Sequence, residues 1–406
     1  MSPSRVHRRG ARSAVGYQME QIVFSADSHV IEPPDLWETR LDRKYRDRGP
    51  RMEKRLPTGG TQELLYFVCP DVDPVLVPSF HLGFANVMDQ GQAYMDGIAR
   101  GWDLAPPSLH DPAERLKEQD IDGVAGELMF PSMSMLIHGI EDPELQAASC
   151  RAFNDWTIEY CSHNPDRMVP IGLVPSDLDL GIKELERARD LGLKGAFIRA
   201  VADRLYSDPV FDRFWSAAED VGLPLTIHDL VLRGKISFNG ANYIALPQES
   251  QLIVSDLIVG GVFERHPRLR IVSAENDVSW LPHLLFRMDH REEKLSRTMS
   301  LSSGGDNLTS PLSMTPSEYA ARNLWASTVF ENEVLEHTIP FFPAEHLMWG
   351  SDYPHPDGSY PYSAKMLSEF YNNVSPEEKA LIIGGSAMAL YDVDVTRLGE
   401  ARLSSS

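Results

Sequence analysis

A carboxylate and an imidazole two residues apart, Asp27 and His29, follow a short apolar run over residues 21–24. Side chains at alternate positions of a strand point to the same side, so a strand through this run would direct both groups into one space. An aspartate and a histidine placed in this way can supply two ligands to one metal ion. An isolated D-x-H pattern also arises by chance from a surface aspartate and a turn histidine, so the interpretation depends on the rest of the chain.

Ionisable side chains also end later apolar, β-rich segments. His228, Glu275 and Asp352 stand at the ends of three of them, and Arg199 ends a fourth. If the segments are parallel strands of a barrel, their carboxyl ends meet on the face where barrel enzymes place their active sites. A barrel that needed only stability has little reason to gather so many charges there, because unpaired buried charge is costly. We therefore predict a site for one divalent metal ion whose ligands are Asp27, His29, His228 and Asp352.

Simpler interpretations of the same residues stay open. His228 could be a histidine satisfied within the core, and Asp352 could cap the turn that follows it. Glu275 could form a buried salt bridge with Arg199 or Arg287. We expect the metal to be zinc. Manganese and iron stay open as alternatives, because ligand softness does not distinguish these metals at a mixed nitrogen and oxygen site.

The elements that must position these side chains are eight predicted strands, most of them followed by a helical pattern. This α/β alternation calls for a parallel sheet with right-handed crossovers, and eight such units close into a (β/α)8 TIM barrel. A doubly wound open sheet is the alternative, but no G-x-G-x-x-G motif follows any strand, so a dinucleotide-binding fold has no support. The predicted strands span residues 21–26, 124–130, 168–174, 194–199, 223–228, 270–274, 326–330 and 346–351.

Segments outside the strand and helix pattern divide the chain further. Residues 1–20 are arginine-rich without apolar periodicity and predict a disordered basic arm. The barrel is predicted over residues 21–392, including an inserted subdomain after the first strand, at 41–109. This insertion is long for a connection, so we expect it to cover the barrel mouth or to form a subunit interface in a homodimer or higher homo-oligomer. Residues 393–406 are predicted to be a polar tail.

Composition and charge restrict the partners. The 406 residues carry a formal net charge of -21, from 38 Lys and Arg against 59 Asp and Glu. Phosphate backbones and anionic membranes would repel this charge, so we expect a small-molecule substrate and neither nucleic acid nor a membrane as partner. No apolar run approaches a membrane span and residues 1–10 lack the apolar middle of a signal peptide, so we expect a cytoplasmic protein. Three scattered cysteines do not predict a disulfide frame or a thiolate zinc site.

Several motifs together resemble one family. From about residue 21 to 392 the chain is similar to the amidohydrolase-related proteins, the branch of the amidohydrolase superfamily that includes aminocarboxymuconate semialdehyde decarboxylase and γ-resorcylate decarboxylase. The motifs are Asp27-Ser28-His29-Val30-Ile31-Glu32-Pro33-Pro34-Asp35-Leu36-Trp37, Asn154-Asp155-Trp156, Pro165-Asp166-Arg167, Leu225-Thr226-Ile227-His228 and Trp349-Gly350-Ser351-Asp352-Tyr353-Pro354-His355-Pro356.

The resemblance implies a distorted (β/α)8 barrel with one divalent metal. The first-strand H-x-H of the family corresponds to Asp27 and His29, its strand-five ligand to His228, and its strand-eight aspartate to Asp352. The chain departs from the family on strand six, where Glu275 stands in place of the usual catalytic histidine. The strand-four lysine that bridges two metals elsewhere in the superfamily is absent, and Arg199 stands there, which favours a single metal.

We draw three functional hypotheses from this pattern. The leading one is metal-dependent hydrolysis of a small cyclic or carboxylated molecule, with Asp352 and Glu275 as catalytic acid/base groups and a metal-activated water as nucleophile. The alternative is nonoxidative decarboxylation of an aromatic or enol carboxylic acid, and the third is a binding barrel without turnover. The predicted substrate-binding residues are Arg199, a possible carboxylate anchor, with His355 and His81.

Overall fold

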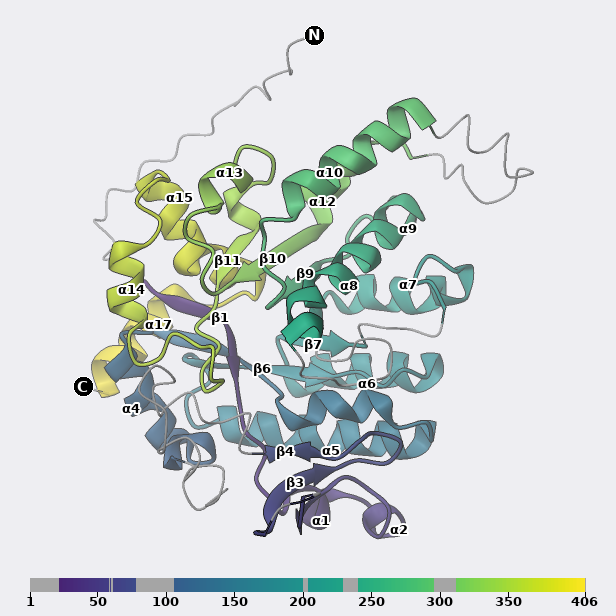
Figure 1. The fold of residues 1–406 in the computed structure, drawn as a ribbon, viewed down its shortest axis with the longest axis vertical. Helices are drawn as coiled ribbons and strands as arrows, with labels where there is room; N and C mark the ends of the chain where they lie inside the picture. The colour runs from purple at the N-terminus through teal and green to yellow at the C-terminus, as the bar shows by residue number, and fades with distance from the viewer. Residues whose placement is uncertain are drawn as a thin grey trace.

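Eight parallel strands surrounded by helices form the core of the molecule (Figure 1). The computed structural model describes residues 22–57, 59, 61–77, 106–199, 204–228, 240–295 and 312–405. The strands follow the order β1–β5–β6–β7–β8–β9–β10–β11, and each neighbouring pair is parallel. Their bounds are β1 (Phe24–His29), β5 (Gly126–Phe130), β6 (Met168–Leu173), β7 (Gly195–Ile198), β8 (Leu225–His228), β9 (Ile271–Ala274), β10 (Leu324–Thr328) and β11 (Leu347–Trp349). The eight predicted strands and the distorted barrel are confirmed, although β1 extends through His29 instead of ending at residue 26.

Most helices begin as the sequence indicates. In α4 and α5 the carboxylates of Asp111 and Asp142 accept from the first backbone amides, and a proline occupies the first turn. The helical segments are α1 (Leu36–Arg40), α2 (Arg43–Arg46), η5 (Pro107–Leu109), α4 (Pro112–Asp122), η6 (Met133–Gly139), α5 (Pro143–Cys161), α6 (Leu178–Leu191), η7 (Pro209–Phe211), α7 (Asp212–Val221), α8 (Gly240–Val259), α9 (Val262–Arg265), α10 (Leu281–His290), η8 (Arg291–Leu295), α12 (Pro316–Asn323), α13 (Leu335–Thr338), η9 (Ala344–His346), α14 (Ser363–Glu369), α15 (Pro376–Ala380), η10 (Leu381–Gly385), α16 (Ser386–Leu390) and α17 (Val395–Ser405).

The barrel closes where the chain beyond β11 meets β1. The amide of Asp352 donates to the carbonyl of Asp27 at 2.8 Å, and the amide of His29 donates to the carbonyl of Tyr353 at 2.7 Å. β1 also carries one extra residue against β5 between Ser25 and Ser28. Such a bulge re-aims side chains locally, and Asp27 lies within it. Backbone hydrogen bonds therefore fix Asp27, His29 and Asp352 relative to one another.

Small residues make this junction possible. The amide of Ser351 donates to Ser25 Oγ at 2.8 Å, and the hydroxyls of Ser28 and Ser351 are 2.9 Å apart. A Cβ on Gly350 would lie 2.3 Å from the Cβ of Asp27 and 3.0 Å from its backbone. No larger residue fits at position 350 unless β1 moves.

A buried ion pair supports β1 at the same end. Arg115 of α4 binds Glu127 of β5 through two hydrogen bonds of 2.6 and 2.9 Å, and a third guanidinium N–H donates to the carbonyl of His29 at 2.9 Å. Burial would raise the pKa of Glu127, but the Arg115 guanidinium lowers it below its ordinary value. The pair is therefore ionised near neutral pH and ties α4 to the strand that carries the predicted ligands.

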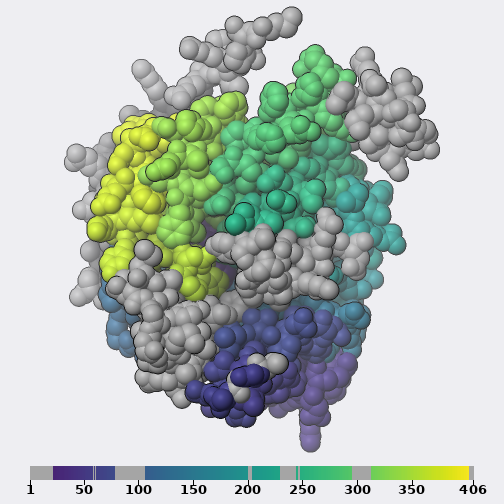
Figure 2. Space-filling model, viewed as in Figure 1, coloured from purple at the N-terminus to yellow at the C-terminus, as the bar shows by residue number. Residues whose placement is uncertain are grey.

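The described part of the insertion forms a small antiparallel sheet of β2 (Arg51–Arg55), β3 (Leu64–Val68) and β4 (Val75–Leu76). Phe67 of β3 packs on Trp37 of α1, with ring centroids 5.1 Å apart. This purple and blue part of the chain gathers at one end of the molecule, away from the yellow C-terminal helices (Figure 2). Residues 78–105 lie outside the described part, so the structure does not test whether the insertion covers the mouth or joins subunits.

The expected polar tail at 393–406 differs from the structure. Helix α17 occupies most of it, and Leu398 is 1% exposed because it packs in a cluster that contains Phe24 and Phe130. The predicted basic arm at 1–20 lies outside the described residues. No described helix is both long enough and apolar enough to span a membrane.

The Gly350→Ala substitution should damage the barrel junction. We expect a loss of about 1–3 kcal/mol in the free energy of unfolding, because the new methyl group would collide with Asp27. Urea denaturation measures the change. Gly399→Ala is the matched control, since a Cβ on Gly399 meets nothing within 4 Å. Equal stability of Gly350→Ala and the wild type would show that the junction is looser than its distances indicate.

Candidate metal centre

The four predicted metal ligands lie together at the carboxyl ends of β1, β8 and β11. Asp27 Oδ1 is 3.4 Å from His29 Nε2 and 3.3 Å from His228 Nε2. Asp352 Oδ1 is 3.3 Å from His29 Nε2. All four side chains are at most 1% exposed, so they share one buried space.

Two more side chains join this space, Glu275 from the loop after β9 and His355 from the loop after β11 that also carries Asp352. Glu275 Oε2 lies 3.4 Å from His228 Nε2, and His355 Nδ1 lies 2.9 Å from Asp352 Oδ1. The His355 ring stacks on that of His29, with centroids 4.0 Å apart. Two overlapping groups each have ligand atoms within 4.8 Å of one another, and the groups are His29, Glu275, Asp352, His355 and Asp27, His29, His228.

Two of the carboxylates are held in an unfavourable backbone conformation. Glu275, after β9, and Asp352, after β11, both have φ of 52°. Residues with a Cβ seldom adopt positive φ, and such strain persists where the surrounding structure enforces it, often at functional sites. The fold thus bends the chain at these two positions so that both carboxylates reach the cluster.

A backbone carbonyl orients His29. Nδ1 of its ring lies 2.8 Å from the carbonyl oxygen of Pro131. A carbonyl can only accept, so Nδ1 carries the hydrogen of the neutral ring, and Nε2 presents its lone pair to the cluster. This is the arrangement by which metal-binding histidines are commonly oriented.

The pKa values show how strongly the cluster attracts positive charge. Burial would raise the pKa of Asp27 and of Asp352, but neighbouring imidazoles hold both pKa values below their ordinary range. Burial would likewise lower the pKa of His29, yet Asp27 and Asp352 raise it to about 10. Glu275 differs, because burial, and next the nearby Asp352, raise its pKa well above the ordinary value.

The residues present fit a divalent cation. His29 Nε2 and both carboxylate oxygens of Asp352 are buried and make no hydrogen bond of good geometry among the described residues; His29 Nε2 and Asp352 Oδ1 have only ion-pair contacts within the cluster. Buried polar atoms are nearly always satisfied, so these atoms indicate a bound group. Imidazole nitrogens and carboxylate oxygens suit zinc, manganese and iron alike. The cluster can therefore hold one such ion.

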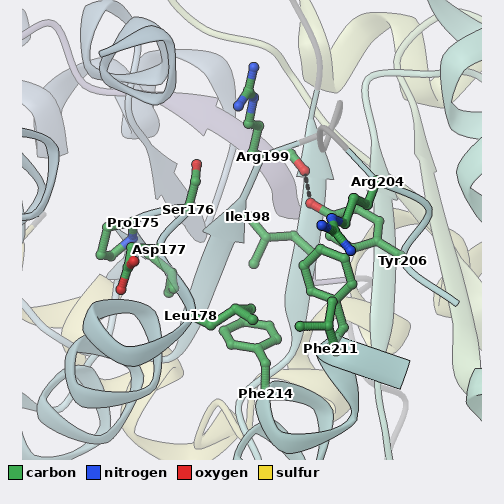
Figure 3. A pocket seen from close by; sticks show the side chains of 12 residues that line it. Pro175, Ser176, Asp177, Leu178, Ile198, Arg199, Arg204, Tyr206, Phe211 and Phe214 are labelled. Carbon is green, nitrogen blue, oxygen red and sulfur yellow. Dashed lines mark hydrogen bonds between the residues drawn. The ribbon is translucent and has the colours of Figure 1, made fainter. Parts of the chain in front are cut away.

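Arg199 stands at the end of β7, as predicted, but outside the cluster itself. It borders a cavity of about 320 Å³ between β6, β7 and the helices that follow them. Leu178, Phe211 and Phe214 form the apolar side of this cavity, and the Arg199 guanidinium points away from them (Figure 3). His81, the other predicted substrate-binding residue besides His355, lies outside the described residues.

Sequence reasoning missed one residue at the centre, Ser327. Ser327 of β10 donates to Asp27 Oδ2 at 3.4 Å and accepts from the amide of Glu275 at 3.1 Å. The acidic residue that follows the same strand, Glu331, does not reach the cluster and accepts from the amides of Val278 and Ser279. Serine is common in strands and loops, so only the predicted strand end could have drawn attention to it.

Curated relatives match parts of the chain. γ-Resorcylate decarboxylase from Rhizobium radiobacter is 29% identical over 194 residues, which cover 44% of this chain and 58% of the relative, so the match spans little more than half of that protein. 2-Amino-3-carboxymuconate-6-semialdehyde decarboxylase from Dictyostelium discoideum is 25% identical over 318 residues, which cover 76% of this chain and 82% of the relative.

Solved structures share the fold. An amidohydrolase from Mycobacterium avium subsp. paratuberculosis superposes with a TM-score of 0.70 at 22% identity, covering 93% of this chain and 100% of that one. A 5-carboxyvanillate decarboxylase from Novosphingobium aromaticivorans, complexed with manganese and 4-hydroxy-3-methoxy-5-nitrobenzoic acid, gives a TM-score of 0.65 at 17% identity, covering 93% and 98%. A sequence model of the amidohydrolase family matches residues 85–393, most of the barrel and four of the six clustered side chains. On this match and the barrel that carries it, the chain belongs to the amidohydrolase family.

Proposed function

We propose that this protein is a metal-dependent, nonoxidative decarboxylase of a hydroxylated aromatic or enol carboxylic acid. Both curated relatives above are decarboxylases, which supports this reaction over the hydrolysis that we first expected. The observation within the site that carries the proposal is Glu275, a carboxyl group with a raised pKa held 3.4 Å from His228. Decarboxylation needs a proton donor at carbon, and a carboxyl group whose pKa is raised by burial and by Asp352 holds a proton that it can supply.

The reaction then divides among a few groups. Asp27, His29, His228 and Asp352 would hold a divalent cation, whose positive charge would stabilise negative charge on the substrate oxygens. Glu275 gives its proton to the ring carbon that bears the carboxylate, and a new C–H bond forms. The bond from this carbon to the carboxylate breaks, its electron pair stays with the ring, and carbon dioxide leaves. Glu275 recovers a proton from solvent, so the net change is one proton consumed for one carbon dioxide released.

Arg199 is our proposed anchor for a substrate carboxylate or phenolate. The ring of Phe197 on β7 lies 6.1 Å from that of His228. Arg199 directly follows the last residue of β7, Ile198, and strand alternation continued by one residue would direct it to the side of Phe197 and the cluster. His138, which stacks on Phe197, has a pKa lowered to about 4. Burial is the main cause, and the positive charge of Arg199 lowers this pKa further. His355, which contacts Asp352, is proposed to border the same substrate.

We propose zinc or manganese as the bound metal ion. The cluster accepts either ion by ligand type, and the solved 5-carboxyvanillate decarboxylase above binds manganese. Assembly into a homo-oligomer and a cytoplasmic location stay predictions from the sequence.

Hydrolysis is the second candidate, favoured by one observation. Asp352 is ionised, because His355 and His29 outweigh the effect of burial on its pKa. An ionised carboxylate in this position can take a proton from water, as the leading sequence hypothesis required.

Metal content tests the site. Protein purified without chelators or a metal-binding tag should hold about one divalent ion per chain by elemental mass spectrometry, and His228→Ala should lose most of it. His346→Gln is the control, since His346 stacks on Trp325 at 4.0 Å and belongs to neither ligand group. Metal retained in His228→Ala, or absent from the wild type, would instead favour a binding barrel.

Carbon dioxide release tests the reaction. Metal-loaded protein should release it from one of a panel of ortho-hydroxybenzoates and enol carboxylates. Glu275→Gln should lower kcat by about 10²–10⁴-fold, because the amide cannot donate the proton of a carboxylic acid. Turnover of amides or lactones without carbon dioxide would favour hydrolysis.

Arg199→Gln should raise KM about tenfold or more while kcat changes little, because a charge-assisted hydrogen bond to the substrate anion is lost. Arg204→Gln is the matched control. Arg204 borders the same cavity, is 68% exposed and pairs with Asp208 at 3.4 Å. Equal KM values for both variants and the wild type would remove Arg199 from the substrate site.

A further inference from the structure

Glu32, three residues after His29, is a carboxylate buried to 0% exposure, and in the described part of the chain it forms no ion pair with a cationic side chain. Its partners are three successive backbone amides of the loop after β5. Oε1 accepts from Ser132 at 3.2 Å and from Ser134 at 2.9 Å, and Oε2 accepts from Met133 at 3.0 Å. A carboxylate in this position holds the loop from β5 into η6 against the end of β1.

The loop that Glu32 holds makes two contacts with the metal cluster. The carbonyl oxygen of Pro131 lies 2.8 Å from His29 Nδ1, and Ser132 Oγ lies 3.2 Å from His355 Nε2. These contacts fix the outer nitrogens of two stacked imidazoles whose other nitrogens face Asp352. A shift of the loop would release both rings from their orientation.

We propose that Glu32 is a positioning residue for the metal centre, which sets the direction of the His29 and His355 rings through the backbone at 131–134. The inference rests on the proposed metal site and not on which reaction the site performs. Groups that orient metal ligands in this indirect way typically contribute about 10- to 100-fold to metal affinity. We expect a contribution of about this size from Glu32.

The test compares Glu32→Gln with the wild type. Glutamine keeps one acceptor oxygen, but its amide group would turn a donor toward the amide of Met133, so at least one of the three bonds is lost. The dissociation constant for Mn²⁺ and for Zn²⁺, measured by competition with a chelating dye, should rise about 10- to 100-fold. Ser132→Ala, which removes only the hydroxyl contact with His355, should give a smaller rise and leaves the Glu32 bonds in place.

Asp122→Asn separates positioning from general destabilisation. Asp122 is also a buried carboxylate, 4% exposed, and it accepts from the amide and the hydroxyl of Ser363. The Asp122→Asn variant should lower the melting temperature of the protein, as Glu32→Gln does, but it should leave the affinity for the metal unchanged.

Each result has a defined meaning. Unchanged metal affinity in folded Glu32→Gln would overturn the inference, and so would an equal loss of affinity in Asp122→Asn. Absence of metal binding in the wild type would be a failure of the proposed metal site itself, which distinguishes the two. If Glu32→Gln does not fold, as judged by circular dichroism, Glu32→Asp takes its place, because the shorter carboxylate cannot keep all three amide contacts, and wild-type metal affinity in that variant would overturn the proposal.

Discussion

The structure depends on the gathering of buried carboxylates and imidazoles where the barrel closes. Ionised groups in such a place are costly unless opposite charge is close to them, because little water reaches them. Asp27 and Asp352 meet this requirement in part through His29, whose pKa they raise to about 10. A divalent cation among the same atoms would neutralise both carboxylates and leave the imidazoles neutral. The buried charges destabilise the metal-free site, and because a bound metal removes this destabilisation, they favour metal binding.

The scaffold holds these charges through backbone geometry more than through side-chain packing. Two backbone hydrogen bonds join β1 to the chain beyond β11, and the bulge of β1 and the absence of a side chain at Gly350 allow the approach. Positive φ at Glu275 and Asp352 adds local strain that the surrounding barrel must offset. Backbone hydrogen bonds therefore fix three of the four predicted metal ligands, Asp27, His29 and Asp352, relative to one another, and His228 joins them from the end of β8.

Periodicity and strand-end position were sufficient to predict much of this arrangement. The eight strands were found because each is a short apolar, β-rich run, and polar or ionisable residues end most of them at the face where the carboxyl ends of parallel strands meet. Asp27, His29, His228 and Asp352 were found for the same reason. Their spacing in the chain carries no information on distance, so the direct contact of Glu275 with His228 required coordinates. Ser327 and Glu32 were missed because they act through hydrogen bonds to partners 52 to 300 residues away, which no local pattern reveals.

The most direct test is to locate the metal. Crystals grown with Mn²⁺ and measured at the manganese absorption edge should show one anomalous peak per chain, bounded by His29 Nε2, His228 Nε2 and the carboxylates of Asp27 and Asp352. A peak there would establish that the charges at the barrel junction serve a metal centre. No peak at this position, or a peak elsewhere on the protein, would contradict that conclusion and leave the buried carboxylates with a structural role alone.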